Sequence, residues 1–206
     1  MRKTTAKSTI ANIIKKHIYD NIREYAIVSI LFLIGLILGV IFINNANETQ
    51  ITQITEYLNN FSNSLKTNYN MELIKNSIKD NVILTIIMWF AGSTIIGLPI
   101  VFGIVSFRGF CMGYTISSAV ATFGIGKGAI FATCSLLMQN IIFIPALLAL
   151  AVTGIKVYKS IIKDNIKFEI IRHTLFSVII LILLVISAVV ETYISPNLLK
   201  MVINYI

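Results

Sequence analysis

Charged side chains are scarce in this chain, making up 13% of its 206 residues, whereas they make up about 25% of an ordinary soluble domain. Hydrophobic residues account for 56% instead, which places the chain among membrane proteins. The net charge of +8 does not indicate nucleic-acid binding, because the basic residues lie beside apolar runs and form no long polar patch. We therefore predict an all-α, polytopic membrane helical bundle with the lipid bilayer as its surroundings.

Histidine and cysteine, which serve as metal ligands and in catalysis, occur only twice each. Cys111 and Cys134 lie inside apolar runs, where a disulfide or a zinc site would lack spacing and access, so we interpret both as packing residues. His17 and His173 flank apolar runs in basic surroundings and are predicted to be interfacial. The polar residues provide no Ser, His and acid set and no pair of carboxylates at a cleft. We expect no enzymatic activity, no metal and no cofactor.

Long apolar runs are abundant, and five of them can cross a bilayer as helices. They lie near residues 26–43, 82–105, 107–124, 129–155 and 175–194, so that residues 26–206 form a single transmembrane domain. The third run is short, because its uncharged part covers about 24 Å, against a hydrocarbon core of about 30 Å. Arg108 lies at the start of this run, and we expect its side chain to extend to the inner surface of the membrane. A re-entrant hairpin through Gly124 to Gly128 is the weaker alternative.

Residues 1–25 are predicted to form a basic amphipathic helix. Isoleucines recur at helical spacing from Ile10 to Ile22, and most charged side chains lie on the other faces. Such a helix suits the surface of an anionic cytoplasmic leaflet. The alternative is a helix that packs on the rest of the protein.

Lysine and arginine are distributed unevenly along the chain, which predicts its orientation. With the amino terminus inside, the cytoplasmic side receives six basic residues of segment 1–25, Arg108 and five between Lys156 and Arg172. The other side receives five, namely Lys66, Lys75, Lys79, Lys127 and Lys200. The positive-inside rule therefore favours an N-in/C-out topology.

Segment 44–80 is the longest polar stretch and is predicted to be extracytoplasmic. It contains apolar residues at helical spacing, which indicates two short amphipathic helices. Ile54, Leu58 and Phe61 lie on the apolar face of the first, either as a lid packed on the bundle or as a docking surface for a partner. Spacing alone does not distinguish these two roles. Glu191, near the end of the last span, is predicted to lie at the outer headgroup level or to form a functional ion pair.

Small residues recur every four positions at Gly109, Gly113, Ser117 and Ala121. On a helix they form one stripe where a second backbone can approach closely. We expect the second helix to belong to the same chain, since five spans must already pack together. A homodimer through this stripe is the alternative.

Two amides and two prolines lie at unusual depths in the apolar runs. Gln139 and Asn140 are adjacent within the fourth span, where their amides need hydrogen-bond partners, and we interpret them as contacts between helices or as a transport site. Pro145 and Pro99 each remove one backbone donor from a span. We therefore predict a break or kink at each proline.

Three runs of the sequence together carry a family resemblance: FRGFCMGYTISSAVATFGIGKG, LLMQNIIFIPALLALAVTG and, near the carboxyl end, ETYISP. They resemble the stage II sporulation protein M family of engulfment membrane proteins, most clearly at residues 87–158 and 191–196. The resemblance implies a non-enzymatic scaffold in the septal and engulfing membrane of the mother cell. It also implies stage II sporulation proteins D and P, which degrade peptidoglycan, as partners.

Two functional hypotheses follow. The first is a scaffold that concentrates wall-degrading proteins at a membrane site, with the outer segment as their docking surface. The second is a transporter or channel with a polar site at Gln139 and Asn140, favoured by the prolines in two spans. A homodimer is compatible with both hypotheses.

Overall fold

The computed structural model describes residues 12, 15–64, 71–94, 96–161 and 166–203, with the side chains of 61–64, 71–74, 135, 137–139 and 190–203 excepted. Within these ranges every regular element is an α-helix. The elements are α2 (Ile22–Asn44), α3 (Glu48–Ser64), α4 (Met71–Gly92), α5 (Gly97–Phe123), α6 (Ile125–Ile161) and α7 (Ile166–Ile203). The predicted all-α class agrees with this composition.

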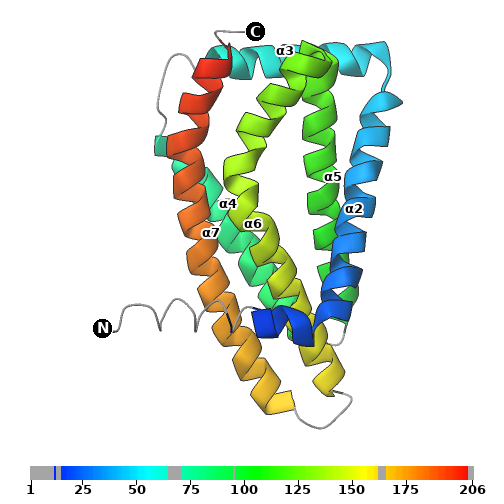
Figure 1. Cartoon of the computed structure of the whole chain (residues 1–206), viewed down its shortest axis with the longest axis vertical. Helices are drawn as coiled ribbons and strands as arrows, with labels where there is room; N and C mark the ends of the chain where they lie inside the picture. The colour runs from blue at the N-terminus through cyan, green and yellow to red at the C-terminus, as the bar shows by residue number, and fades with distance from the viewer. Residues whose placement is uncertain (1–11, 13–14, 65–70, 95, 162–165, 204–206) are drawn as a thin grey trace.

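The helices α2, α4, α5, α6 and α7 run along the length of the molecule, and α3 lies across one end (Figure 1). We call this the α3 end. The opposite end, which we call the basic end, carries the start of α2, the end of α6, the start of α7, and a short helical segment at residues 15–20. This segment is the described part of the amphipathic helix predicted for residues 1–25. The rest of that prediction lies outside the described residues.

Large apolar side chains cover much of the outer surface of the bundle. On α2 only one stripe is buried, formed by Val28, Phe32, Gly35, Gly39 and Ile43, while most of its isoleucines and leucines are exposed. α7 likewise exposes apolar side chains from Leu175 to Val189. Among the described residues, four helical segments are long and apolar enough to cross a membrane: Ile22–Asn44, Gly97–Phe123, Asn140–Ile161 and Ile166–Val189. Apolar surface of this extent is suited to lipid.

The closest contact between helices joins α2 to α5, and it consists of backbone against backbone. A Cβ atom added at Gly35 would lie 1.9 Å from the carbonyl oxygen of Ser106, and one added at Gly113 would lie 2.1 Å from that of Leu36. Gly39 and Gly109 are equally constrained. Later residues of α2 contact later residues of α5, so the two helices run in the same direction. Only glycine permits this separation, because any side chain would meet backbone atoms.

A buried histidine connects α4, α6 and α7 near the basic end. His173 is 1% exposed, and its ring nitrogens lie 2.9 Å from Thr153 Oγ1 and 3.3 Å from the carbonyl oxygen of Trp89. Gly92 and Gly154 pack against each other beside it. The prediction that His173 is interfacial is therefore wrong. Its polar partners come from two other helices, which satisfies the ring away from water.

The predicted spans 82–105 and 107–124 are wrong in their boundaries. α4 ends at Gly92 and α5 begins at Gly97, so a turn lies in the middle of the first predicted span. The hydroxyl of Ser93 bonds to the carbonyl oxygen of Trp89 at 2.8 Å, which helps to close the end of α4. Pro99 lies in the first turn of α5, where a missing N–H costs nothing. The break or kink predicted near this proline is confirmed, because α4 ends at Gly92 and α5 begins at Gly97. α5 then continues to Phe123, which excludes the re-entrant alternative.

The remaining long helices also extend beyond their predicted limits. α6 has 37 residues and passes through Pro145 without a break, and α7 has 38 residues and passes through Pro196. Gly124, with φ of 79°, makes the tight turn between α5 and α6 in a backbone conformation that glycine adopts without strain. The second amphipathic helix predicted in segment 44–80 is instead the first part of α4.

Two glycine substitutions on α5 test the contact with α2. Gly113→Ala places a methyl group against the backbone of Leu36 and is expected to destabilise the protein by about 1–3 kcal/mol or more. Gly103→Ala is the matched control, because a Cβ there meets nothing within 4 Å. It is expected to be neutral or stabilising by up to about 1 kcal/mol. Thermal unfolding in detergent measures both, and equal unfolding temperatures would contradict the contact.

Candidate functional site

Arg108 lies in the middle of the bundle. It is the twelfth of 27 residues in α5, about 17 Å from the start of that helix at 1.5 Å per residue. It shares a cavity with Phe32, which is the eleventh of 23 residues in the neighbouring α2. The prediction that Arg108 extends to the inner surface is therefore wrong. The true start of α5 at Gly97 moves this arginine to mid-depth, where a charged side chain is costly and usually functional.

The cavity at Arg108 has a volume of about 180 Å³ and is enclosed by α2, α5 and α6. Its polar lining consists of Arg108, Thr115 and Asn140, with Cys111 beside them. The guanidinium carbon of Arg108 lies 4.8 Å from the centre of the Phe143 ring, a distance that allows cation–π attraction. Asn140 Nδ2 donates to the carbonyl oxygen of Leu136 at 2.9 Å, which satisfies one of its two donors. The geometry suits a small anion that contacts one cation and neutral donors.

The residues of the predicted small stripe lie in different surroundings. Gly109 and Gly113 contact α2, Ser117 is buried, and Ala121 is exposed one turn further on. The face is thus occupied by a helix of the same chain, and a homodimer through it would require displacement of α2. Sequence reasoning missed the other half of the contact, Gly35 and Gly39. Their four-residue spacing in the first apolar run was a sufficient signal.

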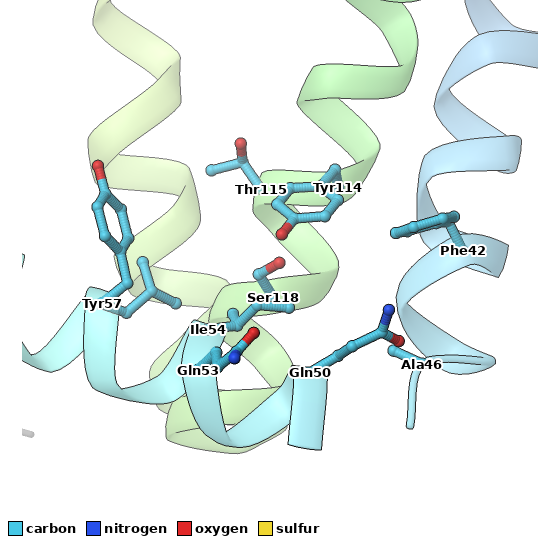
Figure 2. Close-up of a pocket in the computed structure, with 10 residues that line it drawn as sticks. Phe42, Ala46, Gln50, Gln53, Ile54, Tyr57, Tyr114, Thr115 and Ser118 are labelled. Carbon is cyan, nitrogen blue, oxygen red and sulfur yellow. The ribbon is translucent and has the colours of Figure 1, made fainter. Parts of the chain in front are cut away.

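A second cavity, of about 490 Å³, lies under α3 and is shown in Figure 2. Ile54 and Leu58 line it from α3, while Tyr114 and Ser118 line it from α5. Both apolar side chains are half-buried, which favours the lid alternative for α3, and contact of these residues with a partner stays a prediction. Amphipathic helices bury their apolar stripe where a surface is available, and here the end of the bundle supplies it.

Three predicted residues have side chains outside the described part of the structure. These are Phe61, Gln139 and Glu191. Asn140 is accordingly the member of the predicted amide pair that the structure places at a site. Of the two breaks predicted at prolines, the one near Pro99 is present between α4 and α5, whereas α6 continues through Pro145.

The first part of α4 presents charge where its neighbour is apolar. Lys75, Lys79 and Asp80 are exposed, and the next residue, Asn81, donates to the carbonyl oxygen of Leu184 at 3.2 Å. Leu184 lies inside the apolar segment Ile166–Val189 of α7, which is long enough to cross a membrane. Lys79 and Asp80 therefore lie level with the last turns of this segment, and Lys75, about 9 Å before Asn81 along α4, lies level with its end. All three are exposed, on a face that no described element covers. We call Lys75, Lys79 and Asp80 the charged face of α4.

Comparison with known proteins identifies the family. The profile described as Stage II sporulation protein M matches residues 28–196. The chain belongs to the stage II sporulation protein M family. It is a membrane protein of this sporulation-associated family, which is not a known enzyme family. An uncharacterised protein of Methanocaldococcus jannaschii is 30% identical over 180 residues, which cover 82% of this chain and 91% of that relative. No solved structure matches the chain.

The described residues contain no group of three or more His, Cys, Asp or Glu side chains that could hold a metal ion. Candidate sites within the described part of this stage II sporulation protein M family member include the Arg108 cavity, the cavity under α3 and the charged face of α4.

Replacing Arg108 tests whether the charge serves stability or function. Arg108→Met keeps the length of the side chain and removes a charge whose placement at a helix centre costs about 2.5–3.5 kcal/mol. We expect an unfolding temperature equal to or above that of the wild type. Phe143→Leu keeps the charge and removes the ring, and should lower the unfolding temperature by the loss of about 0.5–2 kcal/mol of cation–π attraction. Marked destabilisation by Arg108→Met would show that the arginine is structural.

Proposed function

We propose that this chain is a non-enzymatic scaffold in the septal and engulfing membrane of the mother cell, where it holds peptidoglycan-degrading proteins. Family membership supports this proposal, and the resemblance implies stage II sporulation proteins D and P as the proteins held. In the predicted N-in/C-out topology, the α3 end faces the compartment that contains the wall.

The charged face of α4 is the main structural observation that supports the proposal. A lysine or an aspartate at the centre of a membrane helix costs about 2.5–3.5 kcal/mol on insertion scales. Lys79 and Asp80 nevertheless stand exposed beside the last apolar turns of α7, and Lys75 is exposed one turn further along. Both signs of charge are present, so a partner helix with complementary charges can pair with them. Such a partner removes the cost of leaving this face in lipid.

The outer face of α3 extends the surface that a partner can contact. Glu48, Thr52, Glu56 and Asn59 are exposed there, because the apolar stripe of the helix is turned toward the bundle. This face is polar and mildly acidic, which suits a rim around a docking site better than its centre. We assign the main contact to α4 and a supporting contact to α3.

Charge reversal on α4 tests the docking role. Lys75→Glu with Lys79→Glu should lower the amounts of stage II sporulation proteins D and P that co-purify with the tagged chain from sporulating cells about tenfold. The reason is that like charges then meet across the contact. Quantitative immunoblotting of the purified membranes measures the recovery.

The matched control makes the same charge change at the basic end, with Lys15→Glu and Lys167→Glu. Both of these lysines are exposed and distant in the chain from α4. The control should leave recovery unchanged. Equal recovery with both double variants, at equal amounts of protein in the membrane, would contradict docking at α4.

A second candidate function, transport of a small anion, is favoured by one observation: Arg108 and Asn140 line the same cavity at mid-depth. Charged residues inside a membrane commonly mark ion pathways. The cavity of about 180 Å³ is small enough to favour an inorganic anion over an organic substrate.

Flux through reconstituted vesicles tests this second candidate. If the cavity conducts, wild-type protein should release trapped chloride or phosphate faster than empty vesicles, and Arg108→Met should abolish the difference because the anion loses its only cation within the cavity lining. Asn140→Leu should reduce it. Release at the rate of empty vesicles would reject transport and leave the scaffold as the function.

A further inference from the structure

An apolar cavity at the basic end combines a lipid-like interior with a cationic opening. Its volume is about 810 Å³, within the range of about 300–1,000 Å³ that is common for ligand pockets. It lies between the helical segment at residues 15–20, the start of α2, and the helices α6 and α7. Its lining from α6 and α7 is apolar apart from Arg172, with Ile144, Pro145, Leu148, Ala149 and Phe176 as the remaining residues.

The charged lining is concentrated on one side of this cavity. Lys16, His17 and Asp20 come from the short helical segment, and Arg172 comes from α7, where its Nη1 lies 3.6 Å from Glu169. The described residues 15–24 and 156–172 contain seven basic and three acidic side chains, so the end as a whole is positive. An apolar interior of this kind suits the binding of an acyl chain, and the basic residues at its opening suit the binding of a phosphate group.

His17 holds the short helical segment against the bundle and closes one side of the cavity. Its ring stacks on Phe176 with centroids 5.1 Å apart, and its Nδ1 lies 3.3 Å from the hydroxyl of Tyr25. The other nitrogen, Nε2, is buried without a described hydrogen-bond partner. Desolvation lowers the pKa of His17, the nearby cations Lys156 and Arg172 lower it further, and Asp20 opposes them. The ring is therefore neutral at pH 7.

We propose that this cavity binds one anionic diacyl phospholipid, with its phosphate at Lys16 and Arg172 and an acyl chain along Ile144, Pro145 and Leu148. Lateral lipid contact alone would not require a hollow with cations gathered on one side, and a soluble anion would not require an apolar interior. The lipid is bound from the leaflet at the basic end, which the predicted topology places on the cytoplasmic side. Neither the docking of wall-degrading proteins nor anion transport accounts for this cavity.

Native mass spectrometry of the full chain, released from nanodiscs of phosphatidylcholine and phosphatidylglycerol, tests the site. The wild type should retain one phosphatidylglycerol molecule in preference to phosphatidylcholine. Lys16→Gln with Arg172→Gln should weaken retention about 30-fold, because two contacts with the anionic headgroup are lost. The control, Lys15→Gln with Lys167→Gln, removes the same charge from the same end outside the cavity and should change retention less than about twofold.

A second variant tests the apolar interior separately. Ala149→Trp fills the cavity and keeps all its charges, so it should also abolish retention while the protein unfolds near the wild-type temperature. Equal losses in both glutamine double variants would overturn the proposal in favour of general surface charge. Equal retention of phosphatidylcholine, or retention unchanged by both Ala149→Trp and Lys16→Gln with Arg172→Gln, would overturn it outright.

Discussion

The backbone contact between α2 and α5 is the constraint on which the rest of the bundle depends. In lipid, apolar surface gains nothing by leaving its surroundings, so helices associate through close packing and polar contacts instead of hydrophobic burial. α2 exposes most of its apolar side chains and buries one stripe that contains Gly35 and Gly39. Backbone atoms of two helices then approach along that stripe. The dispersion energy of this contact replaces the hydrophobic effect of a soluble core.

This contact also fixes the depth of Arg108. Gly109, the next residue in α5, packs on the carbonyl oxygen of Phe32 in the middle of α2. A helix held in register there cannot slide to bring the arginine to either surface. The guanidinium group is instead accommodated beside the Phe143 ring and the small cavity that contains Asn140. The same glycines that stabilise the bundle therefore force a charge into its centre.

Hydropathy and helical period predict much of this fold, because they report on single helices. The first span, predicted at 26–43, corresponds to α2, and the small stripe at Gly109 contains the residues that contact it. A break near Pro99 was predicted, but the boundary between the two spans was placed at Arg108, whereas the chain turns between Gly92 and Gly97, where the sequence contains no charge. The signal for this turn was the polar pair Ser93 and Thr94 ahead of Pro99.

Other features depend on contacts that sequence spacing does not contain. His173 is buried because Trp89 and Thr153 reach it from α4 and α6, about 84 and 20 residues away in the chain. The inward direction of Ile54 and Leu58 depends on α3 lying across the end of the bundle instead of standing away from it. Periodicity identified the apolar face in this case but not the surface that it meets.

The arrangement of α7 explains how the chain can serve two surfaces at a fixed separation. Arg172 and Phe176 line the lipid cavity at the basic end, and Leu184 accepts a hydrogen bond from α4 beside the charged face. One continuous helix joins them, and His173 ties that helix to α4 and α6 at the level of the cavity. Rigid spacing of this kind suits a protein that holds others at a membrane, since a scaffold keeps its partners at fixed positions relative to one another. A transporter that alternates between two states would need the helices around Arg108 to move, yet the glycine contacts leave α2 and α5 no room to slide.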